Sequence, residues 1–142
     1  MDNTDKVIIE ELKKNSKITM KELGQKVHLS GQAASTRVMK LEDLGVIKNY
    51  TIDINYPMYG YPVHAMITIY TKYLTHNQYL KFIEAQEDYV LHNYKISGDG
   101  CYLLECNFPS NEKMDEFLVS LSEIVNYKVN IILKDTTESS ID

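Results

Sequence analysis

Residues 19–47 read TMKELGQKVHLSGQAASTRVMKLEDLGVI, and this stretch decides the fold of the first part of the chain. Thr19 and Glu22 have the spacing of a capping box, which predicts the start of a helix. Ser30, after a short connection, is a good N-cap for a further helix, and Gly45 is typical of a helix end. Apolar residues at helical spacing predict the buried faces of the two helices: Leu23 and Val27 in the first, and Ala34, Val38 and Leu41 in the second.

The flanking residues complete a helix-turn-helix. Thr4 is a candidate cap for an earlier helix in which Ile8, Ile9 and Leu12 lie at helical spacing. Residues 46–54 (VIKNYTIDI) are β-branched and partly alternating, which predicts a strand after the last helix. Two helices across a tight turn, preceded by a stabilising helix, define a helix-turn-helix of the winged-helix-like kind. Its third helix is expected to read DNA.

Strand-like and helix-like segments alternate in the rest of the chain. Capping residues predict helices that start near Thr75 and Ser110. The order β-α-β-β-α-β is the ferredoxin-like arrangement, in which two helices cover one face of an antiparallel sheet. The chain as a whole is therefore predicted to be α+β, and dimerisation is expected to cover the other sheet face. Strands are predicted at residues 63–71, 90–96, 101–108 and 128–133.

Charge divides the chain near Gly60. Residues 1–60 carry nine basic and eight acidic side chains, a net +1, whereas residues 61–142 carry six and twelve, a net −6. The formal charge of −5 therefore belongs to the second part, and it does not exclude DNA as a partner of the first. We predict two domains, residues 1–60, with a strand hinge at about 46–60, and residues 61–142. A lysine surplus lies within the first domain, where Glu22 alone opposes Lys13, Lys14, Lys17, Lys21 and Lys26.

The face of the third helix opposite its apolar residues is the candidate DNA-reading surface. Gln can pair with adenine, Ser and Thr can bind bases or phosphates, and the methyl group of Met39 can touch thymine. Arg37 lies at the flank, where it is expected to reach a phosphate or Glu42. The alternative is that this is merely the solvated side of an amphipathic helix. The candidate DNA-binding residues are Ser30, Gln32, Ser35, Thr36, Arg37 and Lys40.

A set of residues in the first part of the chain forms a family pattern: Asp5, Ile8-Ile9, Leu12, Asn15 to Thr19, Glu22-Leu23-Gly24, Leu29-Ser30, Arg37-Val38, Leu41-Glu42 and Gly45-Val46-Ile47. On these residues, the chain resembles the Lrp/AsnC family of bacterial and archaeal feast/famine regulators over essentially its whole length. The resemblance implies double-stranded DNA as a partner and a hinge strand that pairs with its mate across a homodimer. It also implies an octamer built as a tetramer of dimers, and an amino-acid effector bound between C-terminal domains.

The effector loop departs from the family pattern. It reads Gly98-Asp99-Gly100-Cys101-Tyr102, so Cys101 stands where the family usually has an aspartate that helps to bind the ligand's ammonium. A neutral thiol cannot replace a carboxylate in that role. Gly98, Asp99, Gly100 and Cys101 are the candidate effector-binding residues, and a plain hairpin turn is an equally weighted alternative because Asp-Gly is a strong turn signal.

Three other functions are weighed against a sequence-reading regulator. A DNA-architectural protein would bend or wrap DNA with little sequence preference and no effector. An enzyme using Cys101 is disfavoured, because His28, His64, His76 and His92 show no metal-ligand spacing; neither a cofactor nor a metal is expected. RNA binding would need basic and aromatic residues around Tyr102.

The cytoplasm, in association with the nucleoid, is the expected location. No apolar run approaches the ~18 residues of a membrane span. The start of the chain is acidic, unlike a signal peptide. The two cysteines are expected to be reduced thiols.

Overall fold

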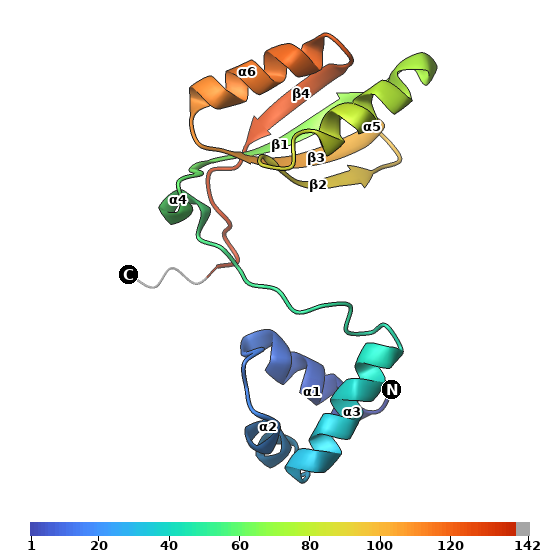
Figure 1. The fold of residues 1–142 in the computed structure, drawn as a ribbon, viewed down its shortest axis with the longest axis vertical. Coiled ribbons are helices and arrows are strands. Elements are labelled where there is room, and N and C mark those ends of the chain that lie inside the picture. The colour runs from blue at the N-terminus through green and yellow to red at the C-terminus, as the bar shows by residue number, and fades with distance from the viewer. Residues whose placement is uncertain (139–142) are drawn as a thin grey trace. The chain divides into compact units, whose positions relative to one another are not determined.

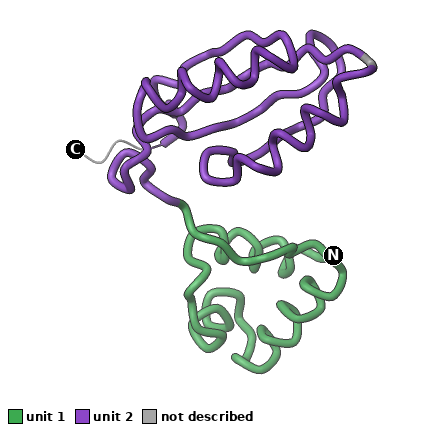
Figure 2. The backbone as a smooth tube through the Cα atoms, turned by 45° about the horizontal axis from the view of Figure 1, so that its top comes forward, with its two compact units in different colours: residues 1–53 green, residues 54–142 purple. Residues whose placement is uncertain are grey.

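The structure is a computed structural model that describes residues 1–138 and divides the chain into two compact units, residues 1–53 and residues 54 onward (Figure 2). A short helix, α4 (Tyr56–Tyr59), comes next along the chain after the last helix of the first unit, and it belongs to the second unit. Our sequence-based division at Gly60 places these residues with the first unit instead. The charge asymmetry is the same for both divisions, because no charged residue lies between 54 and 60.

Unit 1 contains three helices: α1 (Asn3–Lys14), α2 (Met20–Val27) and α3 (Gly31–Asp43). The predicted caps of α2 and α3 are confirmed, since the Thr19 side chain accepts from the backbone N–H of Glu22 and the Ser30 side chain from that of Ala33. The predicted cap Thr4 is wrong. Asp2 caps α1 instead, in a reciprocal pair of hydrogen bonds with Asp5 that sequence reasoning missed. The core of the unit consists of Ile8, Leu12, Ile18, Leu23, Ala34, Val38 and Leu41.

The turn between α2 and α3 depends on Gly24. A Cβ atom at this position would lie 2.5 Å from the backbone oxygen of Leu29 and 2.9 Å from that of Ser30. His28 ends α2 in the left-handed conformation with φ of 60°, and the Leu29 N–H donates to the Gly24 carbonyl. The chain can therefore fold back tightly and start α3 because residue 24 carries no side chain.

The predicted strand at residues 46–54 is wrong for the single chain: these residues form neither helix nor strand. The N–H groups of Val46 and Ile47 donate to the Leu41 carbonyl, so this part of the segment completes the end of α3. Beyond it, Ile52 is 75% exposed and Tyr50 is 50% exposed. A strand needs a neighbour to satisfy its backbone groups, and residues 1–138 supply none here.

Unit 2 is an α+β fold with a four-stranded sheet in the order β2-β3-β1-β4 (Figure 1), which confirms the predicted fold class. Every pair of neighbouring strands is antiparallel. Ser110 caps α6 as predicted, by accepting from the Lys113 N–H. The predicted capping box at Thr75 is wrong, because its hydroxyl bonds the backbone of Lys72 in a preceding 3-10 turn. The elements are β1 (Val63–Tyr70), η1 (Tyr73–Thr75), α5 (His76–Glu84), β2 (Val90–Lys95), β3 (Tyr102–Phe108), α6 (Asn111–Ser122) and β4 (Asn126–Ile131).

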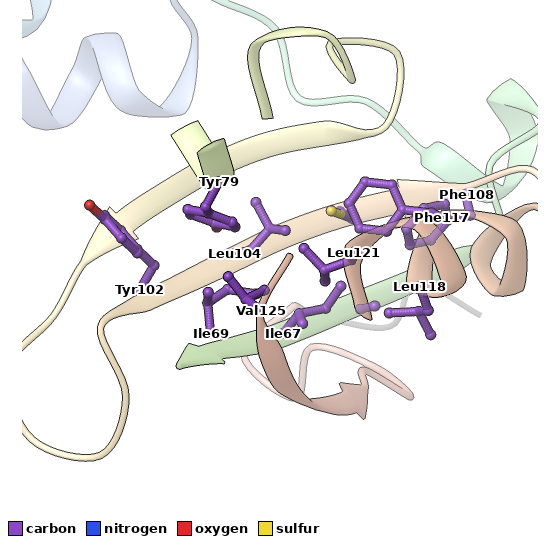
Figure 3. Close-up of a cluster of buried hydrophobic side chains, with 12 residues drawn as sticks. Ile67, Ile69, Tyr79, Tyr102, Leu104, Phe108, Phe117, Leu118, Leu121 and Val125 are labelled. Atoms are coloured by element: carbon purple, nitrogen blue, oxygen red, sulfur yellow. The ribbon is translucent and has the colours of Figure 1, made fainter. Parts of the chain in front are cut away.

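One face of this sheet is buried beneath α5 and α6 (Figures 1 and 3). Leu104 and Ile67 contribute from the central strands, and Tyr79 and Leu121 from the helices; all four are fully buried. The aromatic side chains of β3, Tyr102 and Phe108, lie in this same core, so they are not free to stack on RNA bases. The alternating residues form the opposite, uncovered face, hereafter the open face: His64, Met66, Thr68, Leu103 and Glu105, all half-buried.

We predict that Gly24→Ala destabilises unit 1 by about 1–3 kcal/mol, because the new methyl group overlaps two backbone oxygens that cannot move aside cheaply. A urea titration followed by NMR resonances of residues 1–53 measures this loss without interference from unit 2. Gly31→Ala is the matched control, since its Cβ atom would lie 3.3 Å from Lys21 Cα and should cost less. Equal losses in the two variants would contradict a special role for Gly24.

Candidate DNA-binding surface and effector loop

The outward face of α3 carries most of the candidate DNA-binding residues. Gln32, Thr36, Met39 and Lys40 are exposed, whereas Ser35 is half-buried. The Thr36 hydroxyl donates to the Gln32 carbonyl at 3.0 Å, which satisfies its proton and leaves its oxygen free to accept. The Ser30 hydroxyl is engaged in capping α3. Ala34, Val38 and Leu41 are turned inward, so the core residues of α3 lie on the side opposite the candidate DNA-binding residues.

Arg37 does not bind Glu42, the partner expected from sequence. Its Nη1 donates to both carboxylate oxygens of Asp2, at 2.7 and 2.9 Å, and to Asp5 Oδ1 at 3.3 Å. The guanidinium holds the pKa of the Asp2 carboxyl below its usual range, because its hydrogen bond favours the charged form. Arg37 therefore links α3 to the first turn of α1, and it fixes the orientation of the candidate reading helix.

The lysine surplus is smaller in the folded protein than along the sequence. Glu10 lies 3.5 Å from the Lys13 ammonium, and Glu11 lies 3.6 Å from that of Lys14 and 3.7 Å from that of Lys26. Glu10 and Glu11 lie in α1 just before residues 13–26, the stretch that contains the lysine surplus. The pairs are exposed and therefore weak. Among the described residues, Lys17 and Lys21 form no ion pair.

The four candidate effector residues lie together between β2 and β3. Gly98 and Gly100 adopt positive φ angles of 114° and 91°, as expected for a tight loop. The Asp99 carboxylate accepts a hydrogen bond from the Tyr70 hydroxyl at 2.8 Å, which raises the pKa of Tyr70. Cys101 is bound to the end of β1, with its N–H donating to the Ile69 carbonyl at 2.7 Å. The loop is thus built against β1 rather than projecting as a free hairpin tip.

A cavity of about 210 Å³ is lined by Tyr70 of β1, whose hydroxyl donates to Asp99 of this loop. Lys72, at the end of β1, and Glu123, after α6, also line it, so the cavity offers one charge of each sign. The zwitterion of a free amino acid is matched by such a pair.

Two other expectations concern metals and thiols. Residues 1–138 contain no group of three or more His, Cys, Asp or Glu side chains suited to hold a metal ion. Both cysteines are free thiols, and burial raises the pKa of Cys106 to about 12.

None of the helices in the described part is long and apolar enough to cross a bilayer.

The two units define a DNA-binding regulator that carries a separate ligand-binding domain. Residues 1–48 match the winged helix-turn-helix DNA-binding family, and residues 64–141 match the Lrp/AsnC ligand-binding domain. The chain belongs to the Lrp/AsnC family of transcriptional regulators, a class of DNA-binding proteins rather than of enzymes.

Named relatives support this assignment over the whole chain. The HTH-type transcriptional regulator LrpA of Bacillus subtilis is 53% identical over 133 residues, which cover 94% of this chain and 98% of LrpA. LrpB of the same organism is 33% identical and covers 95% of this chain and 90% of its own. The architectural alternative has no support among these relatives, which are named as transcriptional regulators.

Solved structures share the fold. The structure of B. subtilis LrpC superposes with a TM-score of 0.90 at 31% identity and covers 98% of this chain and 99% of its own. A transcriptional regulator of Neisseria meningitidis in complex with L-Met has the same fold, with a TM-score of 0.89 at 22% identity, over 99% of this chain and 94% of its own.

We predict that Asp2→Asn lowers the stability of unit 1 at pH 7 and that the loss shrinks at acid pH. The folded-state pKa of Asp2 is depressed, so its contribution is present above the pKa of the unfolded chain and disappears as pH falls through the folded value. The urea midpoint of unit 1 at pH 7 and pH 3 tests this. Asp53→Asn, an exposed carboxylate in the loop after α3, is the control and should show no such pH dependence.

Proposed function

We propose that this protein recognises operator DNA by inserting the outward face of α3 into the major groove. The observation that carries the proposal is the exposure of Gln32, Thr36 and Lys40 on one side of a helix whose other side is fully packed. Gln32 and Thr36 supply base contacts, and Lys40 a phosphate contact. Ser35 lies at the margin of this face. Ser30 and Arg37 act differently, by capping α3 and by holding it against α1.

The functional form is a homodimer in this proposal. The open face is half-buried and carries apolar side chains, Met66 and Leu103, around a His64–Glu105 pair whose Nε2 and Oε2 atoms are 2.6 Å apart. Residues 46–54 have strand-forming side chains without a strand partner in the described chain. A second copy supplies both a covering sheet and a pairing strand. Four such dimers form the octamer, which acts on the nucleoid in the cytoplasm.

The loop at residues 98–101 and the cavity beside it form the effector site in this proposal. Lys72 binds the carboxylate of a free amino acid, and Glu123 or Asp99 binds its ammonium. Cys101 does not supply the charge that the family's usual aspartate would, so the acidic partner comes from elsewhere in the site. The match of residues 64–141 to a family of ligand-binding domains supports the proposal.

We predict that Gln32→Ala relaxes sequence preference by about 1–3 kcal/mol, because a glutamine amide can make a bidentate contact with adenine, and that Thr36→Ala, which removes a single acceptor, relaxes it by less. Lys17→Ala should instead weaken binding to all sequences alike and reduce the salt dependence by about one phosphate contact. A titration on the protein's own upstream DNA at several salt concentrations measures both effects. Adding a pool of amino acids to the same titration tests the effector site.

Two results would contradict DNA reading by paired α3 helices. A footprint confined to one isolated half-site is the first, because a dimer places two reading helices about one helical turn apart. A footprint that remains diffuse on the upstream DNA is the second, because it indicates binding without sequence preference. An unchanged salt slope in Lys17→Ala would show that this lysine does not touch phosphate.

We predict that Met66→Asp dissociates the dimer, because it places a charge in the middle of the open face, opposite Glu105. Light scattering coupled to size-exclusion chromatography measures the molecular mass, and circular dichroism checks that the fold is retained. Val119→Asp adds the same charge at an exposed position of α6, away from the open face, and should leave the dimer intact. A Met66→Asp protein that is folded and still dimeric would rule out the open face as the interface.

A further inference from the structure

A second cavity of unit 2 lies apart from the effector loop and has a different chemical character. Its volume is about 220 Å³, and it lies between α4 and the turn that leads into β2. Three tyrosines, Tyr56, Tyr59 and Tyr61, come from α4 and the residues just after it. Glu87 and Asp88 line it from the turn after α5, and Asn107 from β3. The DNA-reading face and the loop at residues 98–101 contribute nothing to it.

The three tyrosine rings pack on one another, one pair edge-to-face and one pair stacked. Tyr56 and Tyr59 have ring centroids 6.5 Å apart and planes inclined by 79°, while Tyr61 stacks on Tyr59 at 5.7 Å. The face of an aromatic ring carries negative potential, so ring faces that border the cavity favour a cation.

Asn107 provides an unused buried acceptor. The residue is 3% exposed, and its side-chain Oδ1 has no hydrogen-bond partner among residues 1–138. Its backbone N–H is satisfied, because it donates to the Tyr89 carbonyl at 2.9 Å. An unpaired buried carbonyl oxygen is costly, and a ligand that brings an N–H donor to it recovers that cost.

The charge of the cavity has one sign. Glu87 and Asp88 are its acidic side chains, and among the described lining residues there is no Lys, Arg or His. Carboxylates, an amide oxygen and aromatic faces all favour the same kind of ligand, one that carries a positive charge and N–H donors.

We propose that this cavity binds a small primary ammonium ion. The ammonium donates to Asn107 Oδ1 and to the carboxylates of Glu87 and Asp88, and the adjoining methylene groups lie against the rings of Tyr56 and Tyr59. The regulator then has a second ligand site, selective for amines and distinct from the site beside residues 98–101.

Titration of the full-length protein with n-butylammonium chloride, followed by NMR, tests the proposal. We expect saturable shifts of the Asn107 side-chain amide and of its neighbours. 1-Butanol, which has the same chain length but no charge, should cause none. Absence of a saturable shift with the amine in the assembled protein, or equal shifts with both compounds, would overturn the proposal.

Variants assign the contacts. Tyr59→Ala should weaken binding by about two- to fivefold, because it removes a ring against which a methylene group beside the ammonium is buried. The double variant Glu87→Gln/Asp88→Asn should weaken it by about tenfold, whereas Glu112→Gln/Asp115→Asn, with the same charge change on α6, should not. Asn107→Leu should abolish the shifts of neighbouring residues while the protein stays folded. Equal affinity in the two double variants would overturn the proposed site.

Discussion

Burial of the four-stranded sheet on one face only is the constraint on which the rest of unit 2 depends. Helices α5 and α6 cover one side with a continuous apolar core that includes Tyr79, Phe117 and Leu121. The alternation of strand residues then places Met66, Leu103 and the His64–Glu105 pair on the other side. A sheet whose second face is partly apolar is complete only when something covers it. The fold thus supplies the surface that the proposed dimer covers.

Unit 1 solves a different problem, because a reading helix must be exposed and yet held still. The absence of a side chain at Gly24 lets α2 and α3 approach closely. The Nη1 atom of Arg37 binds the carboxylates of Asp2 and Asp5 and so links α3 to the start of α1. Arg37, which the sequence predicts to bind DNA, therefore orients α3 instead. The exposed side chains include the neutral Gln32 and Thr36, which suit base contacts, and the charged Lys40, which suits a phosphate contact.

The sequence predicts those features that depend on neighbouring residues. The caps at Thr19, Ser30 and Ser110 could be predicted because a cap joins residues three positions apart. The Arg37–Asp2 contact could not, since it joins residues 35 positions apart and nothing local marks it. At Thr75 the local signal was present, but the chain used the hydroxyl in a different turn.

The candidate sites follow the same division. Helical periodicity was enough to predict which face of α3 is exposed. The turn sequence Gly98-Asp99-Gly100 was enough to predict a loop at residues 98–101. The cavities needed the fold, because Tyr70 and Glu123, or Tyr59 and Asn107, come together only when distant segments pack. The strand expected at residues 46–54 failed for a third reason: its side chains favour a strand, but strand pairing is a property of two segments.

The segment at residues 46–54, which has no strand partner within residues 1–138, also affects how easily a newly made chain pairs with wrong partners. In a single chain, Tyr50 and Ile52 are exposed on a stretch, residues 48–54, whose backbone forms no hydrogen bond within residues 1–138, which is the kind of surface that pairs with wrong partners. Lys48 and Asp53 lie within the segment and break its apolar run with opposite charges. Such charges slow indiscriminate stacking while leaving a symmetric pairing open. On the proposed dimer, the same residues therefore protect the newly made chain until its segment is paired.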